Sequence, residues 1–445
     1  MAGSVFDSSL FSRLFPTREV GRLFTDSAEV RAMLLVEGML AKVQGDQGVI
    51  PAESAAAINR ASMEIQLDPG ALAQETGQNG VSVPGLVAAF RDEMQAPEHA
   101  QFAHWGATSQ DIIDTGLMLR LRQALTLIET DLAQVTIALG TLAETHADLP
   151  MPARTYGQHA TPTSFGAVAA SWGMPLLDLL EELSHLRKSC LMVSLSGAAG
   201  TSSALGPLAA ETRADLAQVL NLTDPERSWH TDRTPILRLA DWFTRVTIAL
   251  GKLGEDTTQL VQTGIQEIRL GGAGSSSTMP QKQNPVTPSV LVALAHQTSG
   301  LLNTLQGASM HRYQRDGAAW FTEWMCLPQI VLGAGSASQT ARALCEGIIP
   351  CPDAMATNLN QQLDMIHAEA LSFALAEYMR RPDAQTATKA LCKEASATNT
   401  PLRDLVARDW PQLDGTTLFD AAHQMGHAPA EARQFAAMVT QRNAS

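Results

Sequence analysis

Apolar residues recur at helical spacing over long stretches of this chain. From Ser109 they stand three or four positions apart as far as Leu142, which predicts one continuous amphipathic helix. At 1.5 Å per residue such a helix is about 50 Å long and needs partners of similar length. The pattern predicts these partners over residues 163–192, 235–268 and, with an interruption, 286–348. Shorter helices are expected in the first hundred residues and after the Pro-Cys-Pro break at residues 350–352, so the predicted fold class is all-α.

Composition and charge narrow the class of protein. Hydrophobic residues make up 45% of the 445 residues but aromatic residues only 5%, a mixture that suits close helix packing better than strands. The 31 Lys and Arg residues against 45 Asp and Glu residues give a net charge of −14. Because neutralising phosphates needs a basic face, we expect no nucleic-acid partner. Any anionic ligand must then be held by a local cluster of hydrogen-bond donors.

The cysteine pattern and the N-terminal sequence indicate a soluble, cytoplasmic protein. Five cysteines, an odd number without a CxxC pair, favour neither a disulfide framework nor a zinc site. No cluster of His, Cys, Asp and Glu in the sequence has metal-ligand spacing, so we expect no metal. The first residues lack a basic start followed by a long apolar stretch, and no uncharged apolar run of about 18 residues occurs. We therefore expect no membrane association.

Three polar segments adjoin the predicted long helices, and the first of them opens the helix at Ser109. It reads His104-Trp-Gly-Ala-Thr-Ser-Gln-Asp111. Free backbone N–H groups and the positive end of the helix dipole favour an anion beside Thr108 and Ser109. Helix capping explains one of these hydroxyls, but not both together with His104. Asp111 and Asp114, three positions apart in the first turns, are explained by complementing the helix dipole.

The second polar segment, residues 155–162, groups Gln158, His159 and Thr161 just ahead of Pro162. A polar cluster followed by proline fits the start of the next helix. For His159, an ordinary structural imidazole is the alternative to a functional role.

The third segment, residues 271–285, is a loop rich in Gly and Ser. It matches neither of the phosphate-binding glycine patterns, and no strand signal precedes it, which argues against a nucleotide triphosphate site. Ser276, the Lys282 ammonium and the Asn284 amide are donors for carboxylate oxygens, and a serine with a lowered pKa can exchange a proton. With little apolar content the loop is a candidate lid, and a flexible surface linker is the alternative.

Together, and in this order, the three segments resemble the signature regions of the fumarase/aspartase superfamily. The chain matches the family loop GSSxMPxKxNP with GSSSTMPQKQNP, the helix start HxGxTSxDxxDT with HWGATSQDIIDT, and the histidine segment with QHATP. Within the superfamily, the run from His104 to Leu132 and the residues Trp320, Glu323 and Trp324 are most similar to the branch that lactonises carboxymuconates. The resemblance covers nearly the whole chain.

The resemblance implies an all-α fold of three domains, namely an N-terminal helical domain over residues 1–107, a central long-helix bundle over residues 108–349 and a C-terminal helical domain over residues 350–445. It also implies a homotetramer in which active sites are shared between subunits. The implied reaction belongs to aromatic catabolism: one carboxylate of a 3-carboxymuconate adds to an internal double bond, and a proton is delivered. No cofactor is implied, because the nucleophile is part of the substrate.

The resemblance further implies roles for individual residues. His159 or Ser276 is expected to deliver the proton, and an imidazole with a pKa of about 6.5 exists in both forms near neutrality. Trp320 and Trp324 are expected to line the site. The remaining candidates are expected to bind a small polycarboxylate substrate: His104, Thr108, Ser109, Gln158, Thr161, Lys282, Asn284 and Arg315.

The chain departs from the family pattern at two places. Gln281 and Gln283 flank Lys282, where relatives often carry basic residues, and Tyr313-Gln314-Arg315 stands where His-Glu-Arg is common. This loss of charge is either neutral variation at the pocket rim or a sign that the third anionic group of the substrate differs. A sulfonate in place of the 3-carboxylate is one such group.

Two other functions are alternatives to a cycloisomerase, an enzyme that forms the lactone described above. An adenylosuccinate-type C–N lyase must hold a nucleotide phosphate, yet residues 316–320 read Asp-Gly-Ala-Ala-Trp in place of a polar, Ser-rich run. A non-catalytic helical-bundle scaffold does not need His159, Ser276 and Lys282 together. The sequence therefore favours the cycloisomerase over both.

Overall fold

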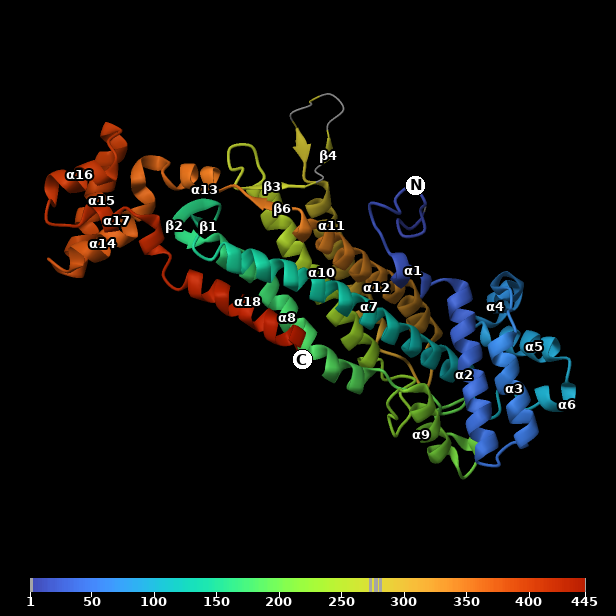
Figure 1. The fold of residues 1–445 in the computed structure, drawn as a ribbon. Helices are drawn as coiled ribbons and strands as arrows, with labels where there is room; N and C mark the ends of the chain where they lie inside the picture. Colours follow the sequence, from blue (N-terminus) through green and yellow to red (C-terminus); the bar gives the residue numbers. More distant parts are fainter. Residues whose placement is uncertain (1–2, 272–273, 276–278, 280–281, 445) are drawn as a thin grey trace. The chain divides into compact units, whose positions relative to one another are not determined.

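The computed structural model describes residues 3–271, 274–275, 279 and 282–444. The predicted all-α class is confirmed, because helices make up most of these residues and the strands are short (Figure 1). The α-helices are α1 (Arg18–Arg22), α2 (Asp26–Asp46), α3 (Ala52–Glu64), α4 (Ala73–Asn79), α5 (Val83–Met94), α6 (Pro97–Ala100), α7 (Ser109–Thr145), α8 (Phe165–Cys190), α9 (Ala209–Leu220), α10 (Thr234–Leu260), α11 (Val286–Ala308), α12 (Gly317–Glu346), α13 (Pro352–Leu359), α14 (Ala368–Ala376), α15 (Arg381–Thr398), α16 (Leu402–Asp409), α17 (Gly415–Leu418) and α18 (Ala428–Ala444).

The remaining elements are short. The 3-10 helices are η1 (Pro69–Leu72), η2 (Ser203–Leu205), η3 (Gln362–His367) and η4 (Ala421–Gln424). The strands are β1 (Pro150–Thr155), β2 (Gln158–Ser164), β3 (Ile268–Leu270), β4 (Gly274–Ser275), β5 (Gln283–Asn284) and β6 (Ile348–Pro350). They form three antiparallel pairs among the described residues, β1 with β2, β3 with β6 and β4 with β5.

The chain divides into two compact units, called the first and the second unit below. The first unit comprises Met1–Asp131, Leu179–Ile248 and Ala293–Gln339. The second comprises Leu132–Asp178, Ala249–Val292 and Thr340–Ser445. The long helices α7, α8, α10, α11 and α12 therefore each contribute residues to both units. The three-domain division expected from the sequence stays a prediction.

The long helix α7 begins at Ser109, as the apolar spacing predicts, and continues to Thr145. Its stripe is fully buried at Leu121, Leu125 and Ile128. Among the described helices it is the one that is long and apolar enough, by length and composition, to cross a membrane. The burial of its stripe against the rest of the protein is that of a core helix.

The helix predicted over residues 235–268 is shorter than expected. Helix α10 ends at Leu260, and the chain then turns through Gly264, whose φ of +91° suits glycine alone. Strand β3 follows and leads directly into the Gly/Ser loop, so the expectation that no strand precedes this loop is wrong. A strand of three residues is too short to leave a period-2 pattern in the sequence.

The helix start predicted over residues 155–162 is also wrong. These residues form the end of β1, the turn of a hairpin and most of β2. Thr155 of β1 pairs with Gln158 of β2, and α8 begins only at Phe165. The two turn residues, Tyr156 and Gly157, have φ values of +52° and +72°. Positive φ at both central positions is what a type I′ turn requires, and its twist matches that of the two strands.

In the first unit, buried polar contacts tie the long helices together. The Trp242 indole of α10 donates to the Leu179 carbonyl of α8 over 2.9 Å. The hydroxyls of Thr247 in α10 and Thr298 in α11 lie 2.6 Å apart. A large apolar cluster, which includes Leu34, Ile112 and Val193, joins α2 and α7 to the chain after α8 and thereby holds the first turns of α7 in place.

In the second unit, α18 runs beside α7 and α8 (Figure 1). A side chain at Gly173 would strike the Phe435 ring, so glycine allows α8 and α18 to approach closely. The Trp172 indole of α8 donates to the Asp256 carboxylate of α10 over 2.8 Å. Helices α14 to α17 enclose a further apolar cluster, which includes Leu371.

Candidate functional site

The carboxylate of Asp111 fastens the start of α7 to two other segments of the first unit. Asp111 is fully buried. Its Oδ1 accepts from the Ser194 hydroxyl (3.1 Å), the Ser196 N–H (2.9 Å) and His230 Nε2 (2.8 Å), and its Oδ2 accepts from the N–H groups of Thr108 (3.0 Å) and Gly197 (2.9 Å). Complementing the helix dipole is therefore only a small part of its role. This one side chain sets the position of residues 194–197 against the helix start.

A buried ion cluster lies one helical turn further along α7. The Arg233 guanidinium, 2% exposed, donates to both oxygens of Asp114 (2.8 and 3.0 Å) and both oxygens of Glu323 (2.9 and 2.6 Å). Burial opposes its charge, but the two carboxylates outweigh burial and raise the pKa of Arg233. Burial raises the pKa of Glu323, and Arg233 opposes that rise. The cluster joins α7, the start of α10 and α12.

Arg315 reaches from the segment before α12 to the start of α7. Its Nε donates to Gln110 Oε1 (3.0 Å), and its Nη2 donates to the Thr108 hydroxyl (3.2 Å) and the Ala198 carbonyl (3.3 Å). The side chain is exposed, and its Nη1 has no acceptor among the described residues. Next to it lies the positive end of α7, which Ser109 begins. A guanidinium, a hydroxyl and a helix N-terminus together can hold a carboxylate.

The His104 imidazole is held in place by a hydrogen bond to a buried glutamate. Its Nδ1 lies 2.7 Å from Glu37 Oε1, and Glu37 is 1% exposed. Burial opposes a proton on His104, but the charge of Glu37 and this hydrogen bond outweigh it and raise the pKa of His104. Gly106 follows with a φ of +75°, and a side chain there would strike Leu205. The signature glycine is thus required by backbone conformation and close packing.

In the second unit, His159 lies on β2 directly opposite Arg154 of β1. The Arg154 guanidinium makes two 2.7 Å hydrogen bonds to the fully buried Glu267, which also accepts from the Asn358 amide over 2.8 Å. This ion pair fixes the hairpin. Burial and the Arg154 charge lower the pKa of His159. The imidazole is half-buried and has no hydrogen-bond partner among the described residues, so it is available to a ligand. Gln158, beside it, is exposed, and Thr161 is half-buried.

Lys282 and Asn284 line a cavity of about 790 Å³ in the second unit. Its walls also carry the positively charged Arg269 and the negatively charged Asp353. The Lys282 side chain is exposed and makes no ion pair within the part of the chain that the structure describes. A cavity of this size with two cations and an amide suits an anionic small molecule. Ser276 and Gln281 lie outside the described residues.

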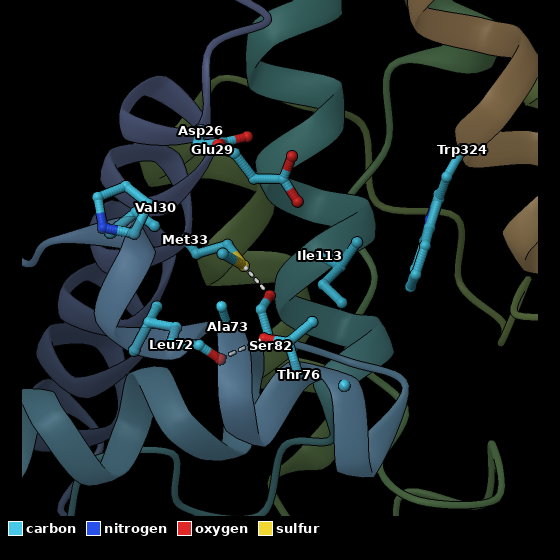
Figure 2. Close-up of a pocket in the computed structure, with 12 residues that line it drawn as sticks. Asp26, Glu29, Val30, Met33, Leu72, Ala73, Thr76, Ser82, Ile113 and Trp324 are labelled. Carbon is cyan, nitrogen blue, oxygen red and sulfur yellow. Dashed lines mark hydrogen bonds between the residues drawn. The ribbon is translucent and has the colours of Figure 1, made fainter.

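A second cavity, of about 490 Å³, belongs to the first unit and differs in character. Figure 2 shows Trp324 and Ile113 on one side of it and Met33 on another, with the carboxylates of Asp26 and Glu29 above. Apolar walls and two carboxylates disfavour a polyanion. Trp324, which the sequence predicts to line the site, lines this cavity, whereas Lys282 and Asn284 line the other one.

The other predicted tryptophan, Trp320, is 1% exposed and belongs to the core of the first unit. It is absent from the linings of both cavities described above. Within the described ranges, no group of three or more His, Cys, Asp and Glu side chains is arranged to hold a metal ion. All five cysteines are among the described residues, and none is bonded to another.

Comparison with known proteins identifies the family. A family model described as "Lyase" matches residues 16–300. The chain is 36% identical over 434 residues to the 3-carboxy-cis,cis-muconate cycloisomerase of Pseudomonas aeruginosa, covering 95% of both chains. The chain belongs to this lyase family. It is an enzyme of the fumarase/aspartase superfamily, as its three signature segments predict.

Proteins similar to this chain along its whole length are named for different reactions. The crystal structure of the 3-carboxy-cis,cis-muconate lactonizing enzyme from Pseudomonas putida superposes with a TM-score of 0.91 at 34% identity, covering 98% of this chain and 100% of that one. A nitrosuccinate lyase from Streptomyces davaonensis is 32% identical, covering 96% of this chain and 94% of the relative. Similarity along the whole chain therefore identifies the family, but it does not identify the substrate.

The predicted site residues of this lyase fall in both units, and several supporting residues escaped sequence reasoning. The first unit holds His104, Thr108, Ser109 and Arg315, and the second holds Gln158, His159, Thr161, Lys282 and Asn284. The residues that sequence reasoning missed are Gln110, Arg154, His230, Arg233 and Glu267. Gln110 stands inside a signature motif, and its place there could have identified it as a candidate. The others had none, because a lone Arg, His or Glu in a helical sequence is normally solvent-exposed.

Proposed function

We propose that this enzyme is a cycloisomerase that converts 3-carboxy-cis,cis-muconate to a carboxymuconolactone in aromatic catabolism. The observation that carries the proposal is similarity over 95% of the chain to a cycloisomerase named for this substrate. The anion-binding groups around Arg315 and Lys282 support it, since the substrate is a small polycarboxylate. No cofactor takes part, because the nucleophile is one of the substrate's own carboxylates.

In the proposed reaction, one carboxylate attacks the internal double bond while a proton is delivered to the carbon next to another carboxylate. After the attack and until the proton arrives, negative charge accumulates on the oxygens of that second carboxylate. Donors fixed in advance stabilise this charge, as an oxyanion hole does. We assign this work to the groups expected from the sequence: His104, Thr108, Ser109, Gln158, Thr161, Lys282, Asn284 and Arg315.

We assign the proton to His159, with Ser276 as its competitor. In the free chain the pKa of His159 is lowered, first by burial and then by Arg154, so the ring is mainly neutral near pH 7. A bound polycarboxylate brings negative charge to the ring and favours the imidazolium. The proton donor is thus formed as the substrate binds. Near-native turnover by folded His159→Gln or Ser276→Ala would remove that residue from the role.

The decisive test is a spectrophotometric assay of the purified protein. Lactone formation destroys the conjugated diene of 3-carboxymuconate, so its ultraviolet absorbance is expected to fall. Because a nitrosuccinate lyase is also similar over 96% of this chain, nitrite release from 2-nitrosuccinate is measured beside it. Nitrite release without any loss of diene absorbance would overturn the proposal, and so would cleavage of adenylosuccinate alone.

The third anionic group of the substrate is tested in the same assay. Gln283 and Gln314 are uncharged where basic or acidic residues are common in relatives, and they are the grounds for proposing that a 3-sulfomuconate is also accepted. We expect turnover of both muconates with similar kcat/KM. A strong preference for the tricarboxylate would end the sulfonate proposal and leave the cycloisomerase intact.

We further propose a cytoplasmic homotetramer of three-domain subunits whose active sites are shared between chains. The superfamily resemblance supports this assembly, and light scattering is expected to give about four times the 47.5 kDa mass of one chain. Co-expression of His159→Gln and Arg315→Ala chains, each of low activity by itself, is expected to restore part of the activity, because some shared sites then carry neither substitution. A fully active monomer would contradict the proposal.

A further inference from the structure

Gln110 links the buried ion cluster to the exposed Arg315. The side chain is fully buried in the second position of α7. Its Nε2 donates to Asp114 Oδ2 (3.2 Å) and to the His230 carbonyl (2.8 Å), while its Oε1 accepts from Arg315 Nε (3.0 Å). Both N–H groups of the amide therefore donate a hydrogen bond, and its oxygen accepts one.

The direction of the Gln110 amide is determined by its partners. A carboxylate and a carbonyl only accept, and a guanidinium only donates. If the amide were reversed, its oxygen would face two acceptors and its NH₂ group would face the guanidinium. Asp114 is held in turn by Arg233, and Arg233 by Glu323, so each member orients the next.

We propose that Gln110 is a positioning residue that holds Arg315 ready for the substrate carboxylate, at the end of a hydrogen-bond relay that starts at Glu323. The inference rests on the proposed function in that Arg315 is taken to bind substrate. Arg315 stands on an exposed segment, and a free arginine there would lose rotamer freedom each time it bound an anion. Gln110, Thr108 and Ala198 fix the side chain beforehand and leave Nη1 to the ligand.

The experiment is a double-mutant cycle on turnover of 3-carboxymuconate. Gln110→Met keeps the length of the side chain and removes both its donor and its acceptor. We expect it to lower kcat/KM about 10- to 100-fold, chiefly by raising KM, because Arg315 loses its fixed position. A partly unfolded preparation would instead lower kcat at unchanged KM. The matched control is Gln339→Met, the same substitution at another largely buried glutamine of the first unit, which is expected to leave both constants unchanged.

The second half of the cycle asks whether Gln110 acts through Arg315. In an Arg315→Ala background, adding Gln110→Met is expected to change kcat/KM less than threefold, as a rough limit for coupled sites. Multiplicative losses, or an unchanged KM in Gln110→Met alone, would overturn the inference.

A crystal structure of each variant separates this inference from the proposed function. The Arg315 guanidinium is expected to be ordered in the wild type and displaced or disordered in Gln110→Met, whichever substrate the enzyme turns over. If the wild type leaves 3-carboxymuconate unchanged but Arg315 moves as expected, the proposed function fails and the positioning role stands. An Arg315 that keeps its place in Gln110→Met overturns the positioning role.

Discussion

Replacing Asp111 by asparagine tests whether one buried carboxylate holds the start of α7 and residues 194–197 together. Three donors face its Oδ1 and two face its Oδ2. Asparagine keeps one oxygen, which satisfies at best the set of three. Its NH₂ group then faces the N–H groups of Thr108 and Gly197, and both lose their acceptor. Each buried, unpaired N–H costs about 1–3 kcal/mol, so Asp111→Asn should lower the free energy of unfolding by about 2–6 kcal/mol.

That loss is large against a total stability of about 5–15 kcal/mol. Equilibrium urea unfolding, followed by far-ultraviolet circular dichroism, measures it through the transition midpoint and slope. Ser194→Ala removes a single donor and is expected to cost about 1 kcal/mol, which gives a folded variant on the same scale. The control is Asp178→Asn, an exposed carboxylate on α8. If Asp111→Asn costs no more than Asp178→Asn, the assigned role of Asp111 is wrong.

Three further predictions concern the titratable groups. If His159 donates the proton, kcat/KM falls as pH rises through the lowered pKa of its imidazole, below about 6.5, and His159→Gln abolishes this limb; an unchanged limb would exclude His159. Glu37 raises the pKa of His104, so the contact between protonated His104 and Glu37 stabilises the folded protein. This contribution to the free energy of unfolding is fully present below the unfolded-state pKa of about 6.5, and it is lost as pH rises through the raised folded-state pKa. Urea midpoints should therefore show that His104→Gln costs more stability at about pH 6 than at about pH 9, and equal costs would contradict this. Glu267→Gln weakens the buried pair with Arg154 and should cost about 3 kcal/mol and lower turnover, whereas unchanged thermal unfolding would refute the assigned role of the pair.

The long helices could be predicted because their apolar stripes are continuous. The start of α7 at Ser109 follows from the polar cap and the stripe behind it. The hairpin at residues 150–164 could not be predicted in this way, since its strands have mixed burial and its turn depends on positive φ at Tyr156 as well as Gly157. A tyrosine in that conformation is not a sequence signal for a turn.

Part of the candidate site could likewise be predicted from the sequence, and part of it could not. The residues that we propose to meet a ligand stand in motifs, and so Thr108, His159 and Lys282 could be named from the sequence. The residues that hold them in place make contacts far along the chain. The sequence predicts only a local dipole role for Asp111, because four of its five hydrogen-bond donors belong to residues 83 to 119 positions away and leave no trace in its neighbourhood.

These distant contacts of Asp111 also bear on how the protein folds. Helix α7 can form from its own sequence within microseconds, but its first turn is completed only when residues 194–197 and His230 arrive. Closing such long loops is slow compared with helix formation. During refolding, helical content should therefore return well before the groups that we propose to bind a carboxylate come together. A nascent chain would carry the signature segment at the start of α7 long before the proposed substrate-binding groups had assembled around it.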